Sequence, residues 1–356
     1  MVSETVFDDA QAISLLTGLV MQYSPSTQER PVVDYLVAQM AALGLRAYRD
    51  EAGNAVGELG DGERVVLLLG HIDTVPGFIP VRRDGEILYG RGSVDAKGPL
   101  ATFVSAAARA GARPGWRLVV VGAVEEEAAT SKGARFLLDR LSPEMVVIGE
   151  PSHWDRMTVA YKGRLLADYT LAREIGHTAG PDGSACADAF AFWQQVQDYA
   201  ATYNAARPRM FEQIAPALRR MHSEDDGFVE KATLSLSFRL PPELDVALLE
   251  AEVRALAGPA EVHCYAHEVA FRASKSTPLA RAFIQAIAGE GGQAQFKVKS
   301  GTSDMNVVAP VWQCPILAYG PGDSSLDHTP NEHLDLDEYR RAIAVLTRVL
   351  TTLASE

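Results

Sequence analysis

Short apolar runs alternate with helical stretches over the first 150 positions of the chain. The unbroken apolar runs lie at 65–69, 118–121 and 145–148. Apolar positions at helical spacing predict two helices within 9–44, separated by a break at 24–26, and further helices at 97–109 and 131–140. Because unbroken apolar strands are buried on both faces, the pattern predicts an α/β fold with a mixed central sheet covered by helices.

From Arg164 the pattern changes to strict alternation, which is typical of a sheet with one exposed face. This block combines alternating strands near 166–170, 234–238 and 262–269 with helical stretches at 184–203 and 245–256. It predicts a smaller α+β domain with a βαβ-like order. The alternation of helical stretches and unbroken apolar runs then returns, with a helix from 278, an apolar strand at 315–319 and a helix at 336–353. We therefore expect an inserted domain at 163–273 between two parts of one larger domain, 1–162 and 274–356.

Composition narrows the class of protein. At 356 residues, with 47% hydrophobic and 22% charged residues, the chain is expected to be a soluble protein of two domains. Acidic residues precede the first apolar stretch, where a signal peptide carries basic charge, so we expect a cytoplasmic location. A formal net charge of -13 argues against nucleic-acid and membrane partners. The three cysteines are far apart and show no metal-ligand spacing.

Candidate ligand side chains follow the predicted strands, at the sheet edge where open α/β sheets place their sites. His71 and Asp73 come directly after the first apolar run, and residues two apart on an extended chain point the same way. Alone, this motif more often has a structural role. Asp95 lies in a glycine-rich turn before a helix. A phosphate cradle is the competing interpretation there, but the spacing is not that of a phosphate-binding loop and an acid would repel the anion.

Three further places in the chain carry acidic or imidazole side chains that are candidate ligands. The acidic triplet Glu125, Glu126 and Glu127 follows the second apolar run, Glu150 follows the third, and His328 lies in a loop before the last helix. A solvated charge run and a capping histidine are the ordinary alternatives for the triplet and for His328.

Together these loops offer His, Asp, Glu, Glu and His from one edge of a sheet. That set of imidazole and carboxylate ligands suits two zinc or cobalt ions that share one carboxylate. Two such ions polarise a carbonyl group and activate a bridging water, and the surplus glutamate then serves as general base.

The order of these motifs resembles the M20 family of metallopeptidases and deacylases over essentially the whole chain. The resemblance implies that His71, Asp95 and Glu150 hold one metal, and that Asp95 also holds the second metal. It implies that Asp73 is the acid that supports the first histidine. The fold that it implies is a di-zinc catalytic domain with an inserted dimerisation (lid) domain, and hence a homodimer.

The remaining ligands of the second metal come from His328 and the acidic triplet. Members of the family commonly have Asp-Glu-Glu where this chain has three glutamates. Direct matching makes Glu126 the general base and Glu127 the metal ligand, and the shifted register, Glu125 with Glu126, remains open.

Within the inserted block, the run 176–180 contains His177 and resembles the family's histidine that stabilises the tetrahedral intermediate across a dimer. A turn histidine that caps the next segment is the alternative. Arg239 is similar to a strand arginine that binds a substrate carboxylate, which a guanidinium holds with two parallel hydrogen bonds.

Longer runs resemble one subgroup of the family, namely GRGSVDAKGPLA, KVKSGTSDMNVVAP and YGPGDSSLDHTPNEH. Enzymes of this subgroup release lysine or ornithine from the C-terminal glutamate of an acidic amino-group carrier protein in lysine and arginine biosynthesis. The resemblance implies substrate contacts from Lys299, Gly301 and Thr302. Lys297 and Lys299, with Lys162 and Arg164, are candidates for a basic rim that guides the carrier, or else ordinary surface charges.

Two other functions remain open from the sequence. An acetylornithine or other N-acyl amino-acid deacylase, or a dipeptidase, would use the same chemistry. A metal-free binding protein with the same fold would be a non-enzymatic alternative, although the chain keeps all five candidate ligands.

Overall fold

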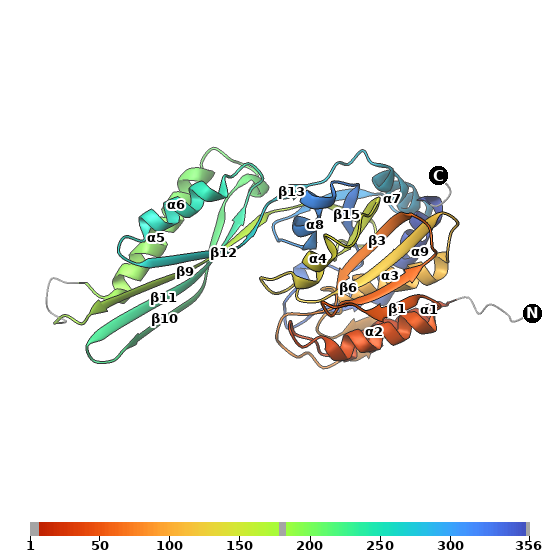
Figure 1. Ribbon diagram of the computed structural model, residues 1–356, viewed down its shortest axis with the longest axis horizontal. Coiled ribbons are helices and arrows are strands. Elements are labelled where there is room, and N and C mark those ends of the chain that lie inside the picture. The colour runs from red at the N-terminus through yellow and green to blue at the C-terminus, as the bar shows by residue number, and fades with distance from the viewer. Residues whose placement is uncertain (1–6, 178–182, 354–356) are drawn as a thin grey trace, which may run out of the picture. The chain divides into compact units, whose positions relative to one another are not determined.

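The computed structural model describes residues 7–177 and 183–353. The chain divides into two compact units. The first unit comprises the described residues of 1–160, 273–298 and 303–356, and the second comprises those of 161–272 and 299–302. Figure 1 gives the labels of the helices and strands of both units.

A mixed sheet forms the centre of the first unit, with the strand order β1-β2-β6-β3-β7-β15-β8 and with β14 paired to β8. The neighbouring pairs β6/β3, β3/β7 and β7/β15 are parallel. Strands β3 and β7 are almost wholly buried, as their unbroken apolar runs predict. The strands are β1 Arg46–Arg49, β2 Ala55–Leu59, β3 Arg64–His71, β6 Trp116–Ala123, β7 Met145–Gly149, β8 Arg156–Tyr161, β14 Gln295–Lys299 and β15 Ile316–Tyr319.

Helices lie on both faces of this sheet (Figure 1). A Cβ added to Gly122 of β6 would meet Leu36 of α2 and Leu100 of α3, so these two helices cover one face. The preceding residue of the strand, Val121, points to the opposite face, where α4 packs on β6 and on α8. The helices of this unit are α1 Asp9–Met21, α2 Arg30–Ala42, α3 Lys97–Ala110, α4 Lys132–Leu137, α7 Pro278–Gly289, α8 Asp304–Trp312 and α9 Leu336–Leu353.

Two glycines explain why strands β3 and β7 end so close together. A Cβ on Gly149 would lie 2.8 Å from the Cα of Gly70 and 3.0 Å from the ring of Phe103 in α3. A larger residue at either glycine would therefore separate the strands or displace the helix. The residues that directly follow these glycines are His71 and Glu150, so the close packing fixes the starting points of two site loops.

A small three-stranded sheet of order β16-β5-β4 closes the first unit beside the site loops. Its strands are β4 Arg82–Asp84, β5 Ile87–Tyr89 and β16 His333–Asp335, and the short helix η2, Ser324–Leu326, precedes β16. The loop between η2 and β16 carries His328, whose φ of 62° lies in the left-handed region. Non-glycine residues adopt this region rarely, and such residues cluster at functional sites.

The second unit is a four-stranded antiparallel sheet of order β10-β11-β9-β12, with α5 and α6 packed on one face. Its core contains Tyr169 stacked on Phe192, with ring centroids 4.5 Å apart. The expected alternation is present, but the βαβ-like order was wrong because all three strand pairings are antiparallel. The elements are β9 Gly163–Glu174, α5 Ala185–Asn204, η1 Met210–Glu212, β10 Ala215–Asp225, β11 Val229–Leu240, α6 Val246–Leu256, β12 Glu261–Glu268 and β13 Phe271–Arg272.

Most of the predicted elements are confirmed, but several elements were not predicted, among them β1, β2, β8 and α8. Helix α4 ends at Leu137, three residues earlier than the sequence pattern indicates. Strand β10 was not predicted, because its residues are exposed along nearly the whole strand and show no apolar alternation. None of the helices within the described part of the chain is long and apolar enough to cross a membrane.

Candidate metal centre

The candidate ligands lie at or near the ends of elements of the first unit. His71 is the last residue of β3, and Glu150 follows β7. Glu127 lies in the loop after β6, and Asp95 precedes α3. Because β6, β3 and β7 are parallel neighbours, their carboxyl ends bring these loops to one sheet edge.

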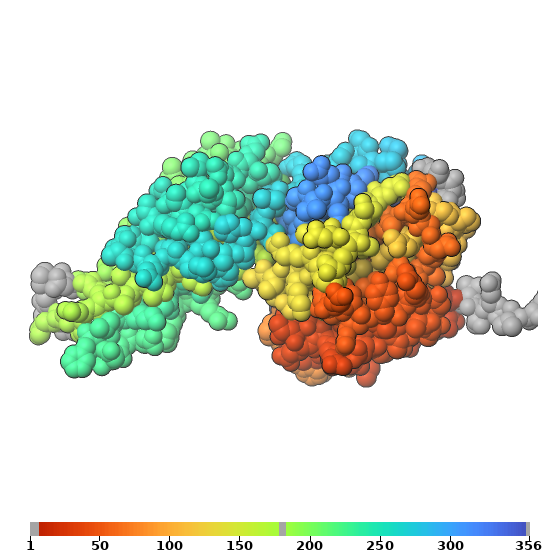
Figure 2. Space-filling model, in the orientation of Figure 1, coloured from red at the N-terminus to blue at the C-terminus, as the bar shows by residue number. Residues whose placement is uncertain are grey.

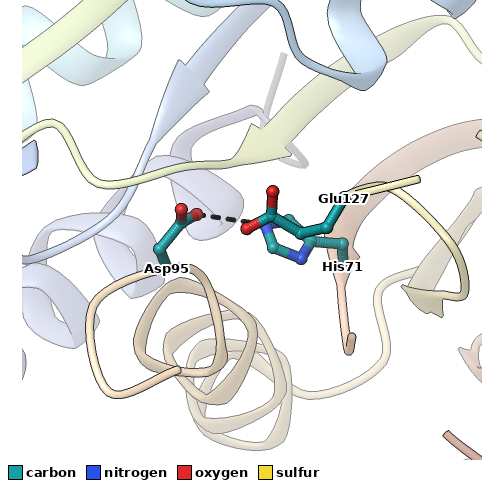
Figure 3. A group of neighbouring side chains, drawn as sticks. All are labelled: His71, Asp95 and Glu127. Atoms are coloured by element: carbon teal, nitrogen blue, oxygen red, sulfur yellow. Dashed lines mark hydrogen bonds and ion pairs between the residues drawn. The ribbon is translucent and has the colours of Figure 1, made fainter. Parts of the chain in front are cut away.

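The structure brings His71, Asp95, Glu127 and His328 together. One ligand atom from each of the first three lies within 4.8 Å of the other two, and their side chains point toward one another (Figure 3). His71 Nε2 is 3.2 Å from Asp95 Oδ1. His328 Nε2 is 3.0 Å from both Asp95 Oδ2 and Glu127 Oε1. Asp95 thus lies between the two imidazoles, with one carboxylate oxygen toward each.

Asp73 is fully buried and supports both sides of this cluster. Its Oδ1 accepts a hydrogen bond from the Glu126 amide at 3.1 Å, and its Oδ2 accepts one from the Glu127 amide at 3.0 Å. The hydroxyl of Ser26 donates to Oδ2 at 2.7 Å. Nδ1 of His71 is 3.0 Å from the Asp73 carbonyl oxygen and 3.5 Å from Oδ1. The acid therefore orients the imidazole and also holds the backbone of the acidic triplet.

The three glutamates of the triplet point in different directions. Glu125 accepts a hydrogen bond from Thr130 Oγ1 at 2.7 Å and lies 3.5 Å from Lys132 Nζ. Glu127 contacts His328, as described above. Glu126 is surrounded by charged groups of the site, with His71, Asp304 and Glu150 as its main electrostatic neighbours.

Glu150 is buried beside Glu126, but it is not part of the group of mutually close donors found among the described residues. Four of the five ligands expected from the sequence thus converge in direct contact. The fifth lies within the same charged neighbourhood.

A buried ion pair ties the loop of His328 to the turn of Asp95. Arg91 Nη1 donates to Glu332 Oε2 at 2.7 Å, and Glu332 Oε1 accepts the amides of Val94 and Asp95 at 3.0 and 3.1 Å. Arg91 also donates to the Thr329 carbonyl oxygen. Sequence reasoning assigned no role to Arg91, Glu332 or Ser26, although the first two lie inside the motifs that it quoted.

Burial and mutual charge shift the pKa values of the cluster strongly. The hydrogen bonds to Asp95 and Glu127 raise the pKa of His328 to about 11. Burial, reinforced by the charge of Asp95, raises the pKa of Glu127 to about 7. Burial also raises the pKa of Glu126 well above its ordinary value, although His71 opposes this. Burial would raise the pKa of Asp95, but hydrogen bonds from the two imidazoles outweigh it and lower that pKa.

These four side chains fit divalent metal ions. Imidazole nitrogen and carboxylate oxygen are the ligand atoms that zinc and cobalt accept, and three donors within 4.8 Å can share an ion after small side-chain movements. Without a metal, carboxylates and imidazoles this close to one another share protons. A metal ion that binds there displaces these protons.

The predicted substrate residues lie in the second unit, which includes 299–302 although the sequence predicted that segment as part of the larger domain. Arg239 Nη1 donates to Thr302 Oγ1 at 2.7 Å, and Thr302 Oγ1 donates to the Lys162 carbonyl oxygen at 3.2 Å. Lys299 Nζ lies 5.9 Å from the ring centroid of Tyr161.

Two further predicted positions, Gly301 and His177, also lie in this unit. A Cβ on Gly301 would meet no atom within 4 Å. His177 is exposed after β9, and residues 178–180 of its motif lie outside the described part of the chain.

Comparison with known proteins identifies close relatives over nearly the whole length. The family model described as Peptidase family M20/M25/M40 matches residues 67–352. A protein of Deinococcus radiodurans named [LysW]-lysine hydrolase is 47% identical, over 97% of this chain and 98% of its own. A protein of Thermococcus kodakarensis named putative [LysW]-lysine/[LysW]-ornithine hydrolase is 36% identical, over 96% of this chain and 92% of its own.

Solved structures show the same fold at low sequence identity. The M20 family metallo-carboxypeptidase Sso-CP2 of Sulfolobus solfataricus has a TM-score of 0.80 at 17% identity, over 97% of this chain and 100% of its own. The YXEP protein of Bacillus subtilis, described as a dinuclear metal binding peptidase from the M20 family, has a TM-score of 0.70 at 12% identity and covers 98% of each chain.

Proposed function

The chain belongs to peptidase family M20/M25/M40, and from this premise we propose that it releases lysine from an amino-group carrier protein by hydrolysing one amide bond. The main support for this substrate is the 47% identity, over 97% of this chain, to a protein named [LysW]-lysine hydrolase. Archaeal relatives at 36% identity carry names that include ornithine, which supports ornithine as a second product. The scissile bond joins the α-amino group of lysine to the γ-carboxyl group of the carrier's C-terminal glutamate.

The site supports a pair of divalent ions, zinc or cobalt, shared between two ligand sets. His71 and Glu150 would serve one ion and Glu127 and His328 the other, with Asp95 between them. Its two oxygens, each directed at one imidazole, support a bridging role for Asp95. Bound ions would polarise the scissile carbonyl group and lower the pKa of a water molecule toward neutrality.

Glu126 is the general base in this proposal. It takes the proton of the attacking water and returns it to the nitrogen of the departing lysine. Its pKa, raised by burial, supports a carboxylate able to hold and release a proton near neutral pH. The Glu126 amide is fixed by Asp73, while Glu125 is engaged with Thr130 and Lys132. These contacts support Glu126 as the base and Glu127 as the ligand within the triplet.

The second unit supplies the substrate contacts and the dimer contact in this proposal. The Arg239 guanidinium, oriented by Thr302, suits a substrate carboxylate, and Lys299 and Gly301 lie on the same segment as Thr302. His177 would stabilise the oxyanion in a partner's site. Strand β10 is an exposed sheet edge, and Phe228 beside it is 80% exposed, which supports pairing with a second copy.

The three free cysteines, with no disulfide among the described residues, support a reducing cytoplasmic compartment. The inserted unit, Tyr161–Arg272 in the structure, corresponds to the proposed dimerisation domain.

Steady-state hydrolysis of two substrates tests the proposed function. We expect a far higher kcat/KM for carrier-linked lysine than for acetylornithine, with activity abolished by a chelator and restored by zinc or cobalt. Faster hydrolysis of acetylornithine would favour the ordinary deacylase. Absence of hydrolysis of both, in protein shown to contain metal, would reject both substrates.

A further inference from the structure

Two open cavities lie next to each other on the α4 side of the central sheet. One has a volume of about 500 Å³, with Val56, Val119 and Val121 as an apolar floor and Phe136 of α4 along its side. The other has a volume of about 450 Å³ and extends along the loop of the acidic triplet. In Figure 2 the red-orange segment that contains β1 and the yellow segment that contains α4 meet on the face toward the viewer.

The two cavities form one continuous groove, because they share Arg49, Asp50 and Glu51. One end of the groove lies over β1, β2 and β6. The other end reaches Val124 and Glu125, which directly precede Glu126 in the chain. The groove therefore leads from the sheet face to the loop that carries the proposed base. Six cations line it, and we call it the arginine groove: Arg30, Arg46, Arg49, Arg117, Arg140 and Lys132.

Five of the six cations of the arginine groove are exposed and Arg117 is half-buried, whereas of the five acids that line the groove only Glu51 is exposed. The Arg46 side chain is 71% exposed, but its partner Glu58, 2.6 Å away, is 6% exposed. Glu58 also lies 3.5 Å from Arg117 Nη1 and accepts the Tyr48 hydroxyl at 2.8 Å. Lys132 is 52% exposed, and its partner Glu125 is 14% exposed. Although the whole chain carries a net charge of -13, this surface presents positive charge to solvent.

One guanidinium group in the groove is well placed to pair with an anionic partner. Arg140 is stacked on Phe136, with its guanidinium carbon 3.6 Å from the ring centroid, and its ion pair with the exposed Glu51 is long at 3.7 Å. Stacking fixes the plane of the Arg140 guanidinium, and Nη1 donates to the Phe136 carbonyl oxygen at 3.0 Å, so Nη2 is the group directed at a carboxylate.

We propose that the arginine groove is the docking surface for an acidic segment of the protein that carries the lysine. This inference rests on the proposed function and extends it to a surface outside the metal centre. An acidic carrier would be repelled by most of this acidic molecule and attracted at the groove. Docking there places the carrier beside the loop of the acidic triplet.

Charge reversal at the groove, matched by charge reversal elsewhere, tests the inference. The groove variant is Arg49→Glu with Arg140→Glu, two residues whose ion pairs are exposed and contribute little to folding. The control is Arg341→Glu with Arg348→Glu on α9. Arg341 matches Arg140, because it is 49% exposed, stacks on Trp154 and pairs with an exposed aspartate. Helix α9 packs on α3, which covers the sheet face opposite the groove, so the control residues lie away from the groove. Each double variant lowers the net charge by four, so the two variants are matched in charge.

The readout is the ratio of kcat/KM for carrier-linked lysine to kcat/KM for the dipeptide γ-glutamyl-lysine, at low and high salt. We expect the groove variant to lower this ratio roughly five- to tenfold at low salt, with a weaker salt dependence, because rim charges act mainly on association. The control variant should keep the wild-type ratio. Thermal midpoints of both variants check that they are folded.

Three outcomes would overturn the inference. These are an unchanged ratio in the groove variant, an equal loss in the control, and wild-type protein that cleaves the dipeptide but not the carrier-linked substrate. If wild-type protein cleaves neither, the proposed function itself fails and the inference falls with it. That result is distinct, because it appears before any variant is made.

Discussion

Replacing Asp73 with asparagine should lower turnover sharply while the protein remains folded. The carboxylate accepts the Glu126 amide on one oxygen and the Glu127 amide and the Ser26 hydroxyl on the other. Asparagine has one acceptor oxygen and one NH2 group, so in either orientation an amide donor of the acidic triplet faces another donor. The base or the ligand then moves away from its position.

The magnitude follows from the number of bonds lost. A hydrogen bond to a charged group contributes about 1.5–3 kcal/mol, and one such bond is lost in the better orientation of the asparagine. If this loss appears in the transition state, kcat falls about ten- to hundredfold, since about 1.4 kcal/mol corresponds to a factor of ten. Ser26→Ala is the matched control, because it removes one hydroxyl donor from Asp73 and keeps both amide bonds.

The assay is kcat and KM on carrier-linked lysine at saturating metal, with thermal unfolding followed by circular dichroism. We expect kcat to fall in Asp73→Asn much more than in Ser26→Ala, with KM little changed. A kcat for Asp73→Asn within about twofold of wild type would refute the conclusion that this acid positions the triplet.

Three further predictions concern the same loops. Glu127→Gln should weaken metal binding and Glu125→Gln should not, which metal analysis after dialysis would reveal. His328, whose pKa is raised from 6.5 to about 11 by its carboxylate partners, must lose its proton to bind a metal. Metal affinity of the metal-free protein should therefore rise up to about tenfold per pH unit between roughly pH 7 and 9, and a flat titration would contradict this. The same proton stabilises the metal-free fold below pH 6.5, and this contribution is lost as the pH rises toward 11. Arg91→Leu should lower the free energy of unfolding by about 3–5 kcal/mol in urea titrations, because it leaves Glu332 charged and unpaired in the interior.

The sequence predicts the parts of this site that depend on strand order. Apolar runs identify β3, β6 and β7, and a parallel arrangement brings the residues after them to one edge. His71 and Glu127 were therefore predictable as neighbours, although they are 56 positions apart in the chain. Helices α1 and α2 and their break were equally visible, because each has a clear apolar face.

Supporting contacts were not predictable, because they join loops at very different positions of the chain. Arg91 and Glu332 are 241 positions apart, and each looks like an ordinary surface charge in the sequence. Ser26 lies in a helix break, where serine is common for local reasons. Strand β10 forms hydrogen bonds with β11 but buries few side chains, so it gives no periodic signal.

Lysine release by Glu126→Gln, measured together with the metal content of the same sample, tests the central claim most directly. Wild-type protein should hold about two divalent ions per chain and release lysine from the carrier. Glu126→Gln should hold the same ions while releasing lysine about 10²- to 10⁴-fold more slowly, because it retains the cluster and loses the base. Release at the wild-type rate by this variant, or undiminished release by metal-free protein, would contradict the account.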